Sequence, residues 1–375
     1  MKTRNFFFLA LVMVMIFSVT VPAFADTVKL GGLAPLTGPY AVYGLAVKNG
    51  IDLYVDTLNA NGGINGDQVE VLWEDDASDD PAVALQLYGD LYDKGCVGLL
   101  GPVLTPQCLA VSDYAYEDGM PMITASGTDA NITLGKDFVY RTCFIDDFQG
   151  YVMANFAADQ GYTDVAILYG ADSAYSNGLV VSFEAQAAAK GLNIVAKESA
   201  SFTDVDFKAQ LTNIKAAGPK AVFVPFYGPE AALILTQAAE IGLETIYMGA
   251  DGISSIVDSI SDKALLTSMT YSDHFAFDSD SETVTNFIKE YEAKYNETPS
   301  VSFAATAYDA ALVMCETIKV AGTKADDINE QIKVGTYEGV SGIISFDENN
   351  NPIKSAFVMT FDAEGAKHFV AKVDP

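Results

Sequence analysis

One structural unit occurs twice in the chain, and this repeat limits the fold more than any other feature. Residues 69–102 read as a strand, an acidic loop, a helix, a Lys-Gly turn and an apolar strand that ends in Gly-Pro. Residues 194–229 repeat this order, with an Ala-Gly turn before the second apolar strand. Short β-branched runs that alternate with helical segments are typical of a parallel sheet covered on both faces. The repeat therefore predicts an α/β fold with two similarly built, Rossmann-like lobes.

The same alternation extends over most of the chain. Strands are predicted over residues 28–37, 69–77, 97–103, 121–125, 164–170, 193–199, 221–228 and 245–250. Apolar residues at helical spacing in segments 47–58 and 284–295 indicate helices that face a core. Residues 339–361 read as a hairpin whose turn, at 347–352, lets the last strand pass from one lobe to the other. Its Asp-Glu-Asn-Asn-Asn run lacks the central Gly and the closing Glu of a calcium loop, so no metal is expected.

The N-terminus reads as an export signal. Two basic residues precede an apolar run over residues 6–21, and Ala23-Phe24-Ala25 follows. The run is shorter than the roughly 20 residues that a membrane-spanning helix needs, and the order is typical of a cleaved signal peptide. Since no Cys follows the run, we expect a signal peptide over residues 1–25 and a periplasmic protein without a lipid anchor.

The charge balance excludes some partners. The chain has 21 Lys and Arg against 50 Asp and Glu, a formal net charge of −29. Such a surface repels nucleic acid and anionic lipid, so we expect neither as a partner, and we interpret the acidity as a source of solubility. The four Cys are expected to be free core residues.

Known catalytic motifs are absent from the sequence. There are two His, and the chain contains no HExxH, GxSxG, Walker or GxGxxG motif. We therefore expect no enzyme activity, no cofactor and no metal. His274 falls where the chain changes lobes, and we assign it a structural role.

Polar groups gather where the predicted strands end. Thr105 and Pro106 begin a helix, whose first amides favour an anion, although Thr105 also suits a simple N-cap. The strand after the first Gly-Pro ends at Ser126, near Thr128, and its repeat equivalent ends at Asp251. Parallel sheets bind ligands at the carboxyl ends of their strands. Donors in one lobe and an acid in the other match the two charged ends of an amino acid.

These stretches carry a family resemblance over residues 26–375. The chain resembles the leucine/isoleucine/valine-binding proteins of bacterial ABC importers, which have the type I periplasmic binding fold. The fragments that carry the resemblance are APLTGPYAVYG, NANGGINGDQVEVLWEDDASD, GLLGPVLTPQ, MITASGTD, YRTCFIDDFQG, ILYGADSAYSNGL, VPFYGPEAALILTQAAEIGL, MGADG and FAATAYDAAL.

The resemblance implies two lobes joined by three crossovers, which close on an amino acid and deliver it to a membrane permease. Lobe 1 comprises residues 26–145 and 274–354, and lobe 2 comprises 146–273 and 355–375. We expect a monomer.

The resemblance also implies roles for individual residues. Thr105 and Thr128 hold the ligand carboxylate, the backbone of Ser126 meets both charged groups, and Asp251 pairs with the ammonium group. The side-chain pocket is lined by Tyr43, Val103, Tyr175, Tyr227 and Phe303. Many family members carry Glu where this chain has Asp251, which is one methylene shorter, so the ligand amine is expected to sit differently or to bind through a water.

Three alternatives stay open from the sequence. The same fold also binds aromatic amino acids, amides, urea and aromatic acids, although a ligand without an ammonium group gives Asp251 no partner. An exported hydrolase of small amides would use Asp251 as a base but lacks a nucleophile. A receptor sensor domain would need an attached membrane segment.

Overall fold

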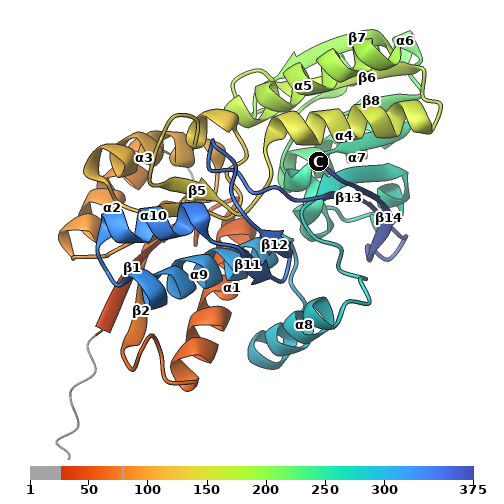
Figure 1. The fold of residues 1–375 in the computed structure, drawn as a ribbon. Coiled ribbons are helices and arrows are strands. Elements are labelled where there is room, and N and C mark those ends of the chain that lie inside the picture. Colours follow the sequence, from red (N-terminus) through yellow and green to blue (C-terminus); the bar gives the residue numbers. More distant parts are fainter. Residues whose placement is uncertain (1–26, 78–79) are drawn as a thin grey trace, which may run out of the picture.

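The elements form two α/β lobes, drawn at the two sides of Figure 1. The computed structural model describes residues 27–77 and 80–375, so the predicted signal peptide lies outside the described residues. The described part of the chain contains no helix that is long and apolar enough to cross a membrane.

The sheet of the first lobe is entirely parallel and has the strand order β2-β1-β3-β4-β5. Its strands are β1 (Thr27–Ala34), β2 (Gln68–Asp75), β3 (Leu99–Leu100), β4 (Met122–Thr124) and β5 (Val139–Arg141). The sheet has helices on both faces: α1 (Ala41–Ala60) packs with α9 (Phe303–Ala321), and α2 (Pro81–Asp93) packs with α3 (Thr105–Asp118).

The sheet of the second lobe repeats this order and extends it, as β7-β6-β8-β9-β10-β13-β14. Its parallel strands are β6 (Asp164–Gly170), β7 (Asn193–Ala200), β8 (Ala221–Phe223), β9 (Ile246–Gly249) and β10 (Met269–Asp273). The antiparallel strands β13 (Ala356–Phe361) and β14 (Lys367–Val373) complete it. Here α4 (Asp146–Asp159) packs with α5 (Ala174–Lys190), and α6 (Lys208–Ala217) with α7 (Gly228–Glu240). The predicted α/β class with two parallel sheets is confirmed.

The remaining elements are short or peripheral. They are the 3-10 helices η1 (Ala130–Ile132), η2 (Asp251–Asp258) and η3 (Lys263–Ser268), the helices α8 (Glu282–Tyr295) and α10 (Ala325–Val334), and the strands β11 (Tyr337–Gly339) and β12 (Gly342–Ile344).

The chain crosses between the two sheets after β5, after β10 and before β13. The last crossing is the dark blue segment that runs toward β13 in Figure 1. The predicted hairpin over 339–361 is wrong in its pairing, because β12 pairs with β11 and β13 pairs with β10. Only the bridge between Phe346 and Pro352 remains of it. The residue limits given above for the two lobes stay a prediction.

The repeat places two loops in corresponding positions. Ser126 follows the end of β4 by two residues, and Asp251 follows the end of β9 by two residues. Both strands have the same place in their sheets, next to the strand that precedes α3 in one lobe and α7 in the other. The two loops therefore lie at the carboxyl ends of equivalent strands, where α/β sheets bind ligands.

Candidate functional site

The carboxylate of Asp251 is the most extensively bonded acid of the site. Asp251 is 1% exposed. Its Oδ1 accepts hydrogen bonds from the Tyr175 hydroxyl at 2.9 Å, the Gln149 amide at 3.1 Å and the backbone N–H of Gly252 at 2.9 Å. Its Oδ2 lies 2.9 Å from Nε2 of His274. A buried carboxylate requires such partners, and here they come from three separate elements and a crossover.

Gln149 ties this acid to two other elements. Its Oε1 accepts hydrogen bonds from the backbone N–H of Asp251 at 3.0 Å and from the hydroxyl of Ser272 at 2.9 Å. Gln149 belongs to the first turns of α4, directly after the first crossover. The sequence reasoning did not identify it, because only folding brings α4 next to a residue 102 positions away.

His274 was also missed as a site residue, since it was expected to be structural only. It is fully buried in the second crossover, and its ring centroid lies 3.8 Å from that of Phe144 in the first crossover. Burial lowers its pKa, while the hydrogen bond to Asp251 acts in the opposite direction. The remaining ring nitrogen, Nδ1, is buried and has no hydrogen-bond partner among the described residues.

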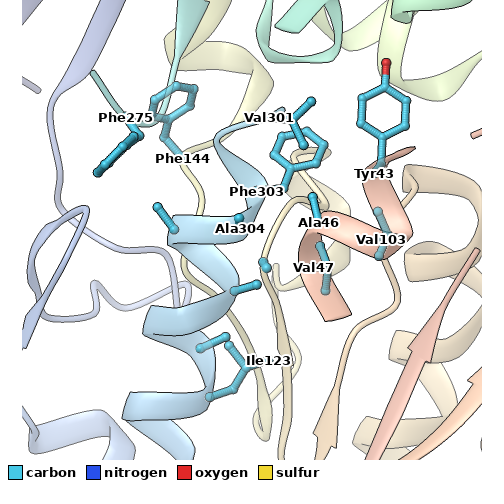
Figure 2. Close-up of a cluster of buried hydrophobic side chains, with 14 of the residues drawn as sticks. Tyr43, Ala46, Val47, Val103, Ile123, Phe144, Phe275, Val301, Phe303 and Ala304 are labelled. Atoms are coloured by element: carbon cyan, nitrogen blue, oxygen red, sulfur yellow. The ribbon is translucent and has the colours of Figure 1, made fainter. Parts of the chain in front are cut away.

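Aromatic residues from both lobes meet beside the acid. Tyr175 and Tyr227 of the second lobe stack at a centroid distance of 4.9 Å. Tyr227 lies 5.7 Å from Tyr43 of α1, and Tyr43 lies 5.5 Å from Phe303 at the start of α9. In Figure 2 the Tyr43 hydroxyl points away from the apolar side chains around Val47.

That hydroxyl reaches into the second lobe. It donates to the carbonyl of Gly252 at 2.6 Å and accepts from the N–H of Gly228 at 2.9 Å and from the Ser255 hydroxyl at 2.6 Å. Close by, the hydroxyl of Tyr40 donates to Oε1 of Glu230 at 3.0 Å. The two lobes are thus in direct contact through Tyr43 of α1 and Tyr40, the N-cap residue of that helix.

The predicted donors of the first lobe lie around the start of α3. Thr105 is the first residue of this helix, and Leu104, not Thr105, occupies the N-cap position. The Ser126 hydroxyl donates to the carbonyl of Val103 at 2.8 Å, which joins the loop after β4 to the loop before α3. Thr128 is 1% exposed, and its hydroxyl interacts with the side chain of Asp146.

Asp146 connects the two groups of residues. Its backbone N–H donates to the carbonyl of Thr128 at 3.0 Å, and its Oδ1 accepts from the Gln149 amide at 3.4 Å. Burial, together with the nearby charge of Asp251, raises the pKa of Asp146 well above its ordinary value. A second buried carboxyl group, which was not predicted, therefore lies close to that of Asp251.

All nine predicted residues are buried, with exposures from 0 to 8%. The structure joins Tyr43, Tyr175, Tyr227, Phe303 and Asp251 through ring contacts and hydrogen bonds, and it joins Val103 to Ser126. Thr128 is connected to Asp251 indirectly, because Asp146 hydrogen-bonds to the Thr128 backbone and to Gln149, which in turn contacts Asp251. For Thr105 the structure gives a position at the helix start but no direct contact with the acid.

One cavity lies away from these residues. A cavity of about 440 Å³ is lined by Asp258, Phe277, Ile288 and Lys367 among others, and none of the nine residues lines it. The tyrosines of the site pack against one another. The site is therefore identified by its polar and aromatic side chains and not by the volume of a cavity. Within residues 27–77 and 80–375 no group of three His, Cys, Asp or Glu is arranged to hold a metal ion.

Comparison with known proteins identifies the family. The family model described as periplasmic binding protein matches residues 27–366. The chain belongs to this family. It is an exported family of solute-binding proteins, not a family of enzymes.

Relatives and solved structures agree with this assignment. The leucine-, isoleucine-, valine-, threonine- and alanine-binding protein of Pseudomonas aeruginosa is 31% identical over 336 residues, which are 87% of each chain. The crystal structure of the branched-chain amino acid transporter substrate-binding protein LivJ of Streptococcus pneumoniae, in complex with isoleucine, has a TM-score of 0.87 and 31% identity. The match covers 93% of this chain and all of that one.

A second structure, the leucine-binding protein LivK of Thermotoga maritima, has a TM-score of 0.86 and 29% identity, covering 93% and 99% of the two chains. The resemblance to leucine/isoleucine/valine-binding proteins is confirmed by these comparisons.

Proposed function

We propose that this periplasmic binding protein captures a free amino acid with a branched aliphatic side chain between its two lobes and delivers it to an ABC transporter permease. The observation that carries the proposal is the buried Asp251 carboxylate at the end of β9, at the position equivalent to Ser126 at the end of β4. The relatives whose names specify leucine, isoleucine and valine support the choice of ligand.

The ligand carboxylate is assigned to the first lobe. The first amides of α3 carry partial positive charge and favour an anion, and Thr105 stands at that helix start. Thr128 is assigned to the same carboxylate, and its buried hydroxyl also interacts with the side chain of Asp146. Ser126 contributes its backbone, since its hydroxyl is already bonded to Val103.

The ligand ammonium group is assigned to Asp251. Charge-assisted hydrogen bonds contribute about 1.5–3 kcal/mol each where water is excluded. The partners of Asp251 fix its orientation in advance, which reduces the ordering cost of binding. The side chain of the ligand is assigned to the aromatic group of Tyr175, Tyr227, Tyr43 and Phe303, together with Val103.

Binding in this mechanism involves no bond chemistry. Lobe 1 takes the ligand carboxylate first, and closure then brings Asp251 and the tyrosines of lobe 2 over the ligand. A monomer suffices for this cycle, and the protein has no catalytic step and needs no cofactor.

The decisive test is the replacement of Asp251. Asp251→Ala is expected to weaken leucine binding at least tenfold in isothermal titration calorimetry, equivalent to about 1.4 kcal/mol. Asp251→Asn, which keeps the shape but removes the charge, should show most of the same loss. Asp280→Ala replaces an exposed acid and serves as the matched control. Unchanged affinity in both Asp251 variants, with melting temperatures near that of the wild type, would remove Asp251 from its assigned role.

The ligand class is tested separately. A thermal-shift screen of the twenty amino acids ranks the side chains, because a ligand stabilises the folded state according to its excess over the dissociation constant. Competition between leucine and 4-methylpentanoate, which lacks the amine, then tests the ammonium group. Equal affinity for the two would favour an acid without an amine as the natural ligand. Recovery of hydrolysed ligand after incubation would instead favour the hydrolase alternative.

A further inference from the structure

The two oxygens of the Asp251 carboxylate differ in the number of groups that they contact. Oδ1 accepts from Tyr175, Gln149 and the Gly252 backbone, whereas within the described chain Oδ2 contacts His274 alone. An ionised carboxylate offers about four acceptor positions over its two oxygens. Oδ2 is therefore the oxygen with capacity left for a further donor.

His274 is held in place from two sides. Its backbone N–H donates to Oδ1 of Asp273 at 2.8 Å, and its ring packs on Phe144 at 3.8 Å and lies 6.1 Å from Phe303. Because Phe303 belongs to the predicted side-chain pocket, the imidazole lies next to both the acid and one residue of that pocket. The imidazole can therefore influence the acid and the ligand together.

The surroundings favour the neutral imidazole at neutral pH. A neutral ring with its proton on Nε2 donates to Asp251, whereas a protonated ring would also need an acceptor for Nδ1, which has none among the described residues. Lys354 of the third crossover, whose Nζ donates to the Thr142 carbonyl at 3.2 Å, disfavours a second cation nearby.

We propose that His274 is a positioning residue of the amino-acid site. Its neutral imidazole donates Nε2–H to Oδ2 of Asp251 and holds the carboxylate for the ligand's ammonium group, and its protonation lowers the affinity for the ligand. This inference rests on the proposed function, because it concerns the same carboxylate.

The direction of the pH effect follows from competition for one oxygen. A protonated imidazole forms an internal ion pair with Asp251 and repels the ammonium group, so proton and ligand oppose each other. Burial lowers the pKa of His274 from its ordinary value of about 6.5. Affinity is therefore complete near pH 7.5 and falls as the solution becomes more acidic than the pKa of His274 in the free protein.

Other acids also titrate near this group. Asp146 faces Asp251, and Asp273 precedes His274 in the chain; burial raises the pKa of both, that of Asp273 to about 7. A change in affinity with pH would not by itself identify the imidazole, so the experiment needs a variant that keeps the hydrogen bond and cannot titrate.

His274→Gln is that variant, since the amide of Gln can donate near the position of Nε2. His274→Leu fills similar space and removes the donor. Leucine dissociation constants of the full chain are measured by calorimetry from pH 7.5 to pH 4.5, and melting temperatures report whether each variant folds.

The wild type is expected to lose more affinity over this range than His274→Gln does. His274→Gln should bind within about threefold of the wild type at pH 7.5 and lose less than threefold by pH 4.5, while His274→Leu should bind at least tenfold more weakly at pH 7.5. Equal pH dependence in the wild type and the Gln variant would overturn the proposal, and so would equal affinities of the Gln and Leu variants at pH 7.5. If the Leu variant does not fold, the pH profile of the Gln variant decides.

Failure of the proposed function would look different. In that case the wild type would bind neither leucine nor another amino acid at pH 7.5. Amino-acid binding with a flat pH profile would contradict only the role of His274.

Discussion

The Tyr43 hydroxyl offers a direct measure of how strongly the lobes hold each other. It makes three hydrogen bonds to the second lobe, with the backbone of Gly252 and Gly228 and the side chain of Ser255. Tyr43→Phe removes all three and keeps the ring that packs on Phe303. The substitution therefore tests polar contact between the lobes without opening a cavity.

The size of the effect can be estimated from these bonds. A hydrogen bond contributes a net of about 0.5–1.5 kcal/mol, so three contribute roughly 1.5–4.5 kcal/mol. When the lobes separate, water hydrates the same groups, so the loss falls on the closed arrangement alone. If ligand binding requires closure, leucine affinity should fall between about tenfold and a thousandfold, at 1.4 kcal/mol for each factor of ten.

Calorimetry with leucine measures this loss, and small-angle X-ray scattering at saturating leucine measures closure. Tyr295→Phe is the matched control, because the hydroxyl of Tyr295 donates to the Asn49 carbonyl at 2.8 Å, between α8 and α1. The control should bind like the wild type. Affinity of Tyr43→Phe within threefold of the control would refute the claim that these bonds stabilise the closed arrangement.

Two further substitutions address the same interface. Gly252→Ala would place a methyl group 2.7 Å from both the Tyr175 hydroxyl and a ring carbon of Tyr227, so leucine affinity by calorimetry should fall at least tenfold; wild-type affinity would mean that the stacked pair can move apart freely. Burial raises the pKa of Glu230 from about 4.5 to about 7, so the folded protein binds this proton more tightly than the unfolded chain and loses stability as pH rises between these values. In Glu230→Gln this loss is absent, so the melting temperature of the variant relative to wild type should increase from pH 5 to pH 8, whereas the exposed control Glu244→Gln should show no such trend. A constant difference would contradict the burial of a charge at that position.

The sequence predicted the fold well because its signals are local. Strands buried on both faces are apolar runs of limited length, and the helices between them carry their own period. The repeat also related two residues that are far apart in the sequence. It predicted that Ser126 and Asp251 are equivalent, and in the structure each follows the end of its strand by two residues. Two copies of one local pattern thus located two loops that no local pattern alone could have related.

The pairing of the C-terminal strands could not be obtained in this way. Residues 356–361 are buried except for the partly buried Phe357 and Thr360, and an apolar run of this kind has the same sequence whichever strand lies beside it. In the structure β13 joins β10 of the second lobe and not β12. The pairing partner of β13 depends on which strand edge has no neighbour when the chain crosses back to the second lobe. The assembled lobes determine that edge, and the local sequence does not.

The missed site residues share the same cause. Gln149 and His274 contact Asp251 from positions 102 and 23 residues away, and neither lies in a motif that specifies such a partner. Their signal was their location at two crossovers, where the chain passes between the lobes beside the site. A polar residue that is buried at a crossover has both sheets as neighbours, which makes it a candidate for the site and not only for the hinge.

The contacts of Asp251 also explain why a short acid fits this position. Its carboxylate is already at hydrogen-bond distance from Tyr175, Gln149 and His274. An added methylene would drive these oxygens into buried groups, and overpacking of this kind typically costs about 1–3 kcal/mol. In this chain the reach toward the ligand therefore depends on where the surrounding side chains hold the acid, and less on the length of the acid itself. Substitutions at Gln149 and His274 should consequently change the affinity for an ammonium ligand, although neither residue is assigned a direct contact with that ligand.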